Sequence, residues 1–257
     1  MGLTAVEVPY RVDGPDDAPP LVLSNSLGST SEMWDPQIPA LAERFRVIRY
    51  EVRGHDGAPA PDGAYSLDDL GADVLALLDR LRVKRTHFAG LSLGGMTGMW
   101  LAVNVPERVD RLVLLCTSAM LSKEHDWPLR ARTVREKGTG AVAEAVVERW
   151  FTPAFTQANP DVAARMRDMV AATPPAGYAG CCDAIDAMDL VDDITAVRAP
   201  TLVIAGREDP ATPPPHAEQI AAQIPGARLE LVDAAHLASY ERPDEVTALI
   251  LSHLEAT

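Results

Sequence analysis

Short apolar runs rich in β-branched residues alternate with longer segments of helical periodicity along most of the chain. This alternation predicts the α/β class, with a mostly parallel central sheet flanked by helices on both faces. We expect strands at residues 6–11, 21–24, 46–51, 86–91, 111–117, 201–205 and 228–232. The strand at 6–11 is expected at an edge of the sheet. The strand at 111–117 is almost wholly apolar, as is typical of a central parallel strand.

Helical spacing of apolar positions follows several of these runs. Ser66, with an acidic residue three positions later, is typical of a helix N-cap, and apolar residues then recur at helical spacing as far as Leu81. A second helix is expected over 94–105, with small residues near its start, and a last one over 243–254.

Residues 119–197 break this alternation. They contain helical patterns at 140–150, 161–171 and 178–188, several prolines and no good strand pattern. We therefore predict a helical cap at 119–197, inserted into a core formed by residues 1–118 and 198–257. Such a cap would cover a pocket and shape it.

Composition narrows the range of partners. The chain of 257 residues has 37 acidic and 23 basic residues, a formal net charge of −14. An acidic surface repels phosphate backbones and anionic membrane leaflets, so we expect no nucleic-acid or membrane partner. An anionic small-molecule substrate would need a local positive pocket.

Cellular location is predicted from what the sequence lacks. Residues 1–11 show no basic segment followed by an apolar run, and no apolar stretch approaches the roughly 20 residues of a membrane span. The 3 cysteines, two of them adjacent, do not have the spacing of a disulfide framework. We expect a soluble, cytoplasmic protein.

Residues 90–94, Gly-Leu-Ser-Leu-Gly, match the pattern G-x-S-x-G. The pattern is short, but here an expected strand precedes it and an expected helix follows. In that setting a sharp strand-to-helix turn exposes the serine at the carboxyl edge of the sheet. Ser92 is therefore the candidate nucleophile, and the alternative is an ordinary serine in a βα turn.

A serine nucleophile needs a histidine base that a carboxylate orients, in the chain order Ser, Asp or Glu, His. Six histidines are available: His55, His87, His125, His216, His236 and His253. Two precede Ser92, His125 falls in the expected cap, His216 opens an expected helix and His253 is expected to be solvated. His236, in the loop after strand 228–232, is the candidate base, and the alternative is a hydrogen-bonded loop histidine.

The candidate acid is Asp209, which follows strand 201–205 at the same edge of the sheet. Glu208 is one residue away and would point elsewhere, and Asp233 is poorly placed to orient His236. The alternative is that Asp209 only caps the turn before Pro210.

With these residues in place, the sequence resembles the 3-oxoadipate enol-lactonases, a family of the α/β-hydrolase fold. The resemblance extends over almost the whole chain. It rests on LSNSLGS at 23–29, Trp34 with Pro36 and Gln37, RYEVRGH at 49–55, GLSLGGMTG at 90–98, RWFT at 149–152, GYAGCCDAIDAMDL at 177–190, IAGREDPATP at 204–213 and the His236 loop.

The resemblance implies hydrolysis of a small lactone that bears a carboxylate, without cofactor or metal. It also implies an oxyanion hole. Related hydrolases carry a His-Gly pair in the segment where this chain has residues 25–29, and the residue after that pair donates its backbone N–H. That alignment assigns the N–H of Leu27 as one donor. The N–H of Leu93, just after the nucleophile, is the second. The alternative for residues 25–29 is a plain turn.

The start of the expected cap is locally basic, with Arg130, Arg132, Arg135 and Lys137. We expect Arg130, or else Arg135, to pair with the substrate carboxylate, beside Trp127 as a pocket wall. A solvated basic helix face is an equal alternative.

Three residues depart from the family pattern: Glu51 stands for an aspartate, Asp56 for a glycine whose backbone can require positive φ, and Ala58 for a serine. Rival functions remain. A general carboxylesterase or cofactor-free perhydrolase would use the same triad, and a non-catalytic ligand-binding homologue would not use it at all.

Overall fold

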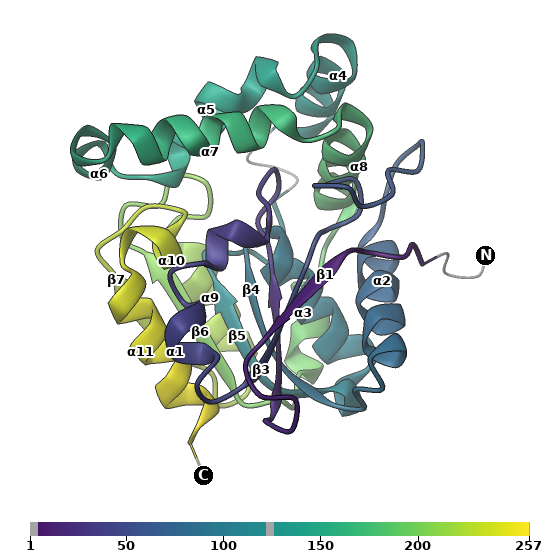
Figure 1. Ribbon diagram of the computed structural model, residues 1–257, viewed down its shortest axis with the longest axis vertical. Coiled ribbons are helices and arrows are strands. Elements are labelled where there is room, and N and C mark those ends of the chain that lie inside the picture. Colours follow the sequence, from purple (N-terminus) through teal and green to yellow (C-terminus); the bar gives the residue numbers. More distant parts are fainter. Residues whose placement is uncertain (1–4, 122–125, 257) are drawn as a thin grey trace.

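The structure is a computed structural model that describes residues 5–121 and 126–256. A sheet of seven strands, in the order β1-β3-β2-β4-β5-β6-β7, runs through its centre (Figure 1). Only β1 is antiparallel to its neighbour, so the predicted α/β class with a mostly parallel sheet is confirmed. The strands are β1 Tyr10–Asp13, β2 Pro20–Ser24, β3 Arg46–Tyr50, β4 Thr86–Leu91, β5 Val109–Leu115, β6 Thr201–Gly206 and β7 Arg228–Val232.

The first strand begins later than the pattern at 6–11 predicts. The backbone N–H of Val6 donates to the Asp73 carboxylate at 2.7 Å and is not part of the sheet. Pro9 has no N–H for a strand ladder, so regular pairing starts at Tyr10. The expected edge position of this strand is confirmed.

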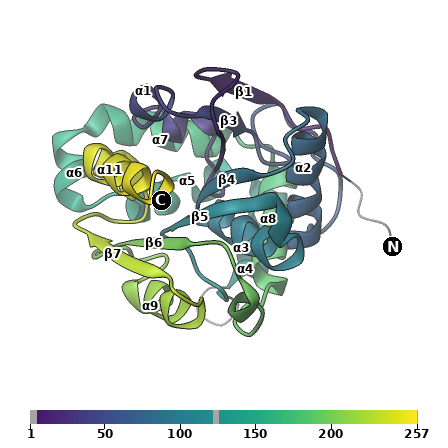
Figure 2. The same ribbon diagram turned by 90° about the horizontal axis from the view of Figure 1, so that it is seen from below.

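Helices cover both faces of the sheet. Figure 2 shows α11 (Pro243–Leu254) on one face and α2 (Leu67–Arg80) with α3 (Leu93–Asn104) on the other. The predicted N-cap at Ser66 forms a full capping box with Asp69. The remaining helices outside residues 126–187 are α1 Ile38–Leu41, α9 Pro214–Gln223, α10 Ala238–Glu241 and the short η1 Ser31–Trp34, η2 Pro106–Arg108 and η3 Asp193–Ala196.

Between β5 and β6, the described residues form five α-helices that lie across one end of the sheet, at the top of Figure 1, and we call them the cap helices. They are α4 Trp127–Lys137, α5 Gly140–Trp150, α6 Pro153–Ala158, α7 Pro160–Ala172 and α8 Pro175–Ala187. Helix α4 packs on α8, and α5 packs on α7. The cap helices therefore stand above the carboxyl ends of the strands, where parallel α/β sheets hold their ligands.

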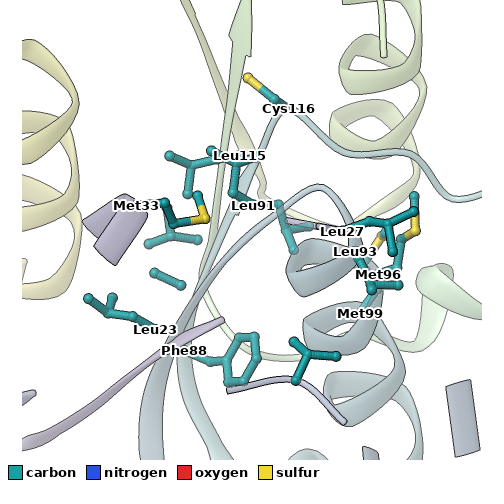
Figure 3. Packing of buried hydrophobic residues seen from close by; sticks show 14 of the residues in the cluster. Leu23, Leu27, Met33, Phe88, Leu91, Leu93, Met96, Met99, Leu115 and Cys116 are labelled. Atoms are coloured by element: carbon teal, nitrogen blue, oxygen red, sulfur yellow. The ribbon is translucent and has the colours of Figure 1, made fainter. Parts of the chain in front are cut away.

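The core surrounds the strand end that leads to Ser92. Leu91 of β4 and Leu115 of β5 are direct neighbours across the ladder and are fully buried (Figure 3). Met96 and Met99 of α3 are also fully buried. Each such side chain stabilises the fold by roughly 1.5–3 kcal/mol, so this end of the sheet is a rigid base for a site.

We expected His253 to be solvated, and this prediction is wrong. The side chain is buried at the end of α11, and its Nε2 lies 3.1 Å from the Pro200 carbonyl oxygen. The prediction for His125 concerns a residue that lies outside the described ranges. None of the helices in residues 5–121 and 126–256 is long and apolar enough to cross a membrane.

Candidate active site

Ser92 occupies the turn between β4 and α3 with an unusual backbone, φ 55° and ψ −115°. The tightness of this turn explains the flanking glycines. A Cβ on Gly90 would lie 2.2 Å from the Gly94 carbonyl oxygen, and a Cβ on Gly94 would lie 2.3 Å from that of Ser24. The G-x-S-x-G pattern therefore reflects close packing of α3 against β4 and β2, which holds Ser92 at the strand end.

Neighbouring backbone and side chains hold the strained turn. The Ser92 N–H donates to the Leu115 carbonyl at 2.9 Å, and the Thr117 hydroxyl donates to the Ser92 carbonyl at 2.7 Å. Strain of this kind persists only where the surrounding structure fixes it, and it gathers at functional sites.

Asp209 and His236 meet at the carboxyl ends of β6 and β7. His236 Nδ1 lies 2.8 Å from Asp209 Oδ2, and both side chains are buried. Because an ionised carboxylate only accepts hydrogen bonds, Nδ1 carries the proton and Nε2 is left as the basic atom. Asp233, by contrast, is exposed and pairs with Arg207 at 2.9 Å.

Asp209 is held in its ionised form. Its Oδ1 accepts the N–H groups of Ala211 and Thr212 at 2.8 and 3.1 Å, and its Oδ2 accepts the Thr212 hydroxyl at 2.7 Å. Burial alone would raise the pKa of Asp209. Attraction to His236 and hydrogen bonds from His236 and Thr212 outweigh burial, so that pKa lies below its usual value.

Ser92 and His236 line one pocket beneath the cap helices, so the structure brings the three sequence-predicted residues together. The full lining is Ser26, Leu27, Ser92, Met96, Leu121, Trp127, Arg130, Val146, Arg149, Trp150, Ile185, Ala211, Thr212 and His236. No hydrogen bond joins the Ser92 hydroxyl to the His236 ring among the described residues. Contacts of this kind often tighten only when substrate binds.

Two backbone N–H groups near Ser92 are available to a ligand. Ser26 N–H donates to Met33 Sδ and Gly28 N–H to His55 Nε2, but Leu27 N–H has no acceptor among the described residues. Leu93 is the first residue of α3, and its N–H likewise has none within the described part of the chain. The positions fit an oxyanion hole.

The 51–56 segment braces the loop that carries Leu27. Glu51 accepts the Ser31 N–H at 3.1 and 3.2 Å, and burial raises its pKa although the hydrogen bonds from Ser31 oppose the shift. His55 is fully buried between the Gly28 N–H and the Arg53 carbonyl, and burial lowers its pKa to about 4. Asp56 has φ 33°, so the position where related chains have glycine does adopt positive φ.

The cap helices contribute cations to the pocket, but not the full set that the sequence suggested. Trp127 and Arg130 line the pocket, three residues apart on one face of α4. Arg135 does not line the pocket and pairs with Asp183 of α8. Five residues correspond to about 140° around a helix, which turns Arg135 away from Arg130. Of the two expected carboxylate ligands, the structure therefore places only Arg130 in the pocket.

Arg149, at the end of α5, is a pocket residue that the sequence reasoning did not single out. It stands beside Trp150 in the RWFT segment, and an arginine next to an apolar aromatic residue near a helix end was the available signal. Burial lowers the pKa of Arg149, and the nearby positive charge of Arg130 lowers it further.

Arg130 is enclosed by aromatic rings. Its guanidinium lies 5.0 Å from the centre of the Trp127 ring and 5.4 Å from that of Tyr178, and it donates to the Tyr178 hydroxyl. Neither Arg130 nor Arg149 forms an ion pair with an acidic residue of the described ranges. Two neighbouring cations that lack an ion-paired acid within the described ranges favour an anionic ligand.

Comparison with known proteins agrees with the geometry. A family model described as the alpha/beta hydrolase fold matches residues 19–243. The 3-oxoadipate enol-lactonase 2 of Acinetobacter baylyi is 37% identical, over 94% of this chain and 91% of that protein. A Stutzerimonas stutzeri protein named as a carbamate hydrolase, RutD, is 30% identical, over 93% of this chain and 92% of its own.

The crystal structure of the enol-lactonase from Burkholderia xenovorans superposes with a TM-score of 0.95 at 41% identity, covering 97% of this chain and 96% of that one. The chain therefore belongs to the α/β-hydrolase family and is a hydrolase by descent. Within that family it is similar, over nearly its full length, to the 3-oxoadipate enol-lactonases, which confirms the resemblance seen in the sequence.

Proposed function

We propose that this chain hydrolyses a small lactone or ester that bears a carboxylate, with 3-oxoadipate enol-lactone as the first candidate substrate. The observation that carries the proposal is the pair of cap arginines, Arg130 and Arg149, without an acidic partner in the described chain, in the same pocket as Ser92 and His236. The names of the similar enol-lactonases support it.

In the proposed mechanism, Ser92 Oγ attacks the lactone carbonyl carbon while His236 Nε2 takes its proton. Asp209 stays ionised, holds the imidazole in orientation and stabilises the imidazolium that forms. The N–H groups of Leu27 and Leu93 donate to the oxygen that becomes negative, which contributes several kcal/mol to catalysis in comparable sites.

Collapse of the tetrahedral intermediate breaks the ring C–O bond, and His236 returns its proton to the departing enolate. An enolate leaves more easily than a simple alkoxide, and ketonisation of the resulting enol makes ring opening hard to reverse. His236 then takes a proton from water, whose oxygen attacks the acyl carbon. Collapse of this second tetrahedral intermediate breaks the bond between the acyl carbon and Ser92 Oγ, His236 returns the proton to Oγ, and the acid is released.

The first test incubates the purified chain with freshly generated 3-oxoadipate enol-lactone and follows loss of its ultraviolet absorbance. Ser92→Ala is the control, with an expected loss of up to about 10⁶ in kcat. If the lactone survives but an aryl ester is cleaved, the triad stands and the substrate is wrong. If neither substrate reacts, the hydrolytic mechanism itself is wrong.

The second test concerns the arginines. Arg130→Met and Arg149→Met should lower kcat/KM for an anionic ester by about tenfold or more each, since hydrogen bonds between ions are worth roughly 1.5–3 kcal/mol. A neutral ester of the same length should be much less affected. Arg135→Met, which alters the same helix outside the pocket, is the matched control. Equal losses on both esters would reject the carboxylate site.

A second candidate is hydrolysis of a small carbamate, which the similarity to the RutD protein favours. The same nucleophile and oxyanion donors would serve that reaction. A kcat/KM for a carbamate above that for the enol-lactone would replace the first candidate by this one.

A further inference from the structure

One carboxylate outside the pocket lining links two distant parts of the chain. Glu241, the last residue of α10, accepts the Ala235 N–H at 3.0 Å and the Thr152 N–H at 3.2 Å through Oε2. Its Oε1 accepts the Thr152 hydroxyl. Figure 1 shows α10 beneath the α6 end of the cap helices. Glu241 is half-buried and forms no ion pair within the described ranges, so neutral donors from both segments satisfy its charge.

Both segments carry pocket residues. Ala235 directly precedes His236. Arg149 lies in the last turn of α5, and Thr152, three residues later, is the N-cap of α6. Further backbone contacts join the same segments. Leu237 N–H donates to the Trp150 carbonyl at 2.8 Å, but His236 N–H reaches the Arg149 carbonyl only at 3.4 Å. Residues 149–152 and 235–237 therefore lie side by side, and Glu241 supplies the charge-assisted part of their contact.

This contact matters because a carboxylate-bearing substrate is held at two points. One end would meet the cap arginines, and the scissile carbonyl would meet Ser92 and His236. A misplacement of about 1 Å between such points costs on the order of a hundredfold in rate. A neutral ester is held only at the catalytic end, so it does not sense where Arg149 stands.

We propose that Glu241 is a positioning residue that fixes Arg149 relative to His236 and thereby sets the preference for anionic over neutral substrates. The proposal rests on the proposed function, in which the cap arginines bind the substrate carboxylate. Glu241 touches no reacting atom, and it acts through the two backbone segments that it joins.

The experiment compares two aryl esters of equal chain length, mono-para-nitrophenyl glutarate and para-nitrophenyl pentanoate. For each variant the measured quantity is the ratio of their kcat/KM values. Glu241→Ala should lower the anionic-to-neutral ratio by about tenfold, which is within the usual range of coupling between residues of one hydrogen-bond network. Glu241→Gln should keep most of it, because its amide oxygen can accept both N–H groups and its NH₂ can donate to the Thr152 hydroxyl.

Glu218→Ala is the matched control, since Glu218 is an exposed glutamate of α9 outside the pocket lining, and its ratio should equal that of the wild type. If Glu241→Ala does not fold, Thr152→Val removes one contact of the bridge and should lower the ratio in the same direction. In an Arg149→Met background, Glu241→Ala should leave the ratio unchanged, because the positioned group is gone.

Equal losses on both esters with Glu241→Ala would overturn the inference, as would a drop in the ratio that persists in the Arg149→Met background. The proposed function has its own readout. A wild-type chain that does not prefer the glutarate ester would overturn the carboxylate site and the inference with it. A wild-type preference that Glu241→Ala leaves intact would overturn the inference alone.

Discussion

At the scale of single residues, Ser92, the candidate nucleophile, occupies a backbone conformation that costs stability. Its φ of 55° with ψ −115° is an arrangement that residues with a Cβ rarely adopt, and it costs of order 1–3 kcal/mol. Glycine lacks that penalty. We therefore expect Ser92→Gly to be more stable than Ser92→Ala by about 1 kcal/mol, after allowance for the extra flexibility of unfolded glycine.

Urea unfolding of the two variants measures this difference, and both should lack esterase activity. The comparison with Ser92→Ala removes the effect of losing the hydroxyl. A glycine variant that is less stable than the alanine variant would show that the turn is not strained.

The buried imidazole of His55 predicts how stability depends on pH. Its pKa falls from 6.5 to about 4 in the folded chain because burial disfavours the charged form. A lowered histidine pKa means that the unfolded chain binds the proton first. The free energy of unfolding should therefore fall as the pH drops from 6.5 towards 4, by up to about 3 kcal/mol from this residue.

His55→Gln removes this titration while keeping an acceptor for the Gly28 N–H. Unfolding in urea between about pH 7.5 and pH 4.5 should show wild type losing its stability advantage over His55→Gln as the pH falls. His87 and His253, whose pKa values burial also lowers, are common to both proteins and cancel in the difference. Parallel stability curves would contradict the assignment.

At the scale of elements, the start of α3 packs so closely on β2 that there is no room for a side chain at Gly94. Gly94→Ala would place a Cβ 2.3 Å from the Ser24 carbonyl oxygen, so α3 must move away from β2. We expect a loss of roughly 1–3 kcal/mol or more in the free energy of unfolding, together with much of the activity, because Leu93 N–H moves with the helix.

Gly140→Ala is the matched control for that prediction. Its Cβ would meet only the Ala171 side chain, at 3.9 Å, in the first residue of α5. Alanine is the better helix former, so this variant should be neutral or slightly more stable. Thermal unfolding of both variants decides the matter, and a Gly94→Ala protein as stable as Gly140→Ala would contradict the close packing of α3 on β2.

Elements with strong local signals could be predicted from the sequence. The strand-to-helix turn at Ser92 could be predicted, because an apolar strand precedes it and the glycines on either side are needed where α3 packs closely on the sheet. The loops of Asp209 and His236 followed from the chain order of a known fold. The pocket arginines were harder, because whether Arg130 or Arg135 faces Ser92 depends on which side of α4 packs on α8. No local pattern encodes that choice.

At the scale of the whole molecule, the pocket exists only where cap and sheet meet. Glu241 and Thr152 are 89 residues apart in sequence. Thr152 belongs to the RWFT segment, but no local pattern pairs it with Glu241, so their contact could not be predicted from the chain alone. The early strand at 6–11 was misplaced for a similar reason, since the Asp73 side chain that binds Val6 N–H comes from α2. Polar contacts between segments that are far apart in sequence could not be predicted, because no local pattern indicates which segments meet.

The net charge of −14 predicts how kcat/KM for an anionic ester depends on salt concentration. At low salt the whole molecule repels an anionic substrate, while the partly buried arginines attract it at short range. Salt screens the long-range repulsion of exposed charges more strongly than contacts inside a pocket. For the glutarate ester, kcat/KM should therefore rise roughly twofold to fivefold between about 20 and 200 mM salt. The pentanoate ester should not change. A fall for the glutarate ester would mean that the attraction of the pocket extends into solvent and outweighs the charge of the rest of the molecule.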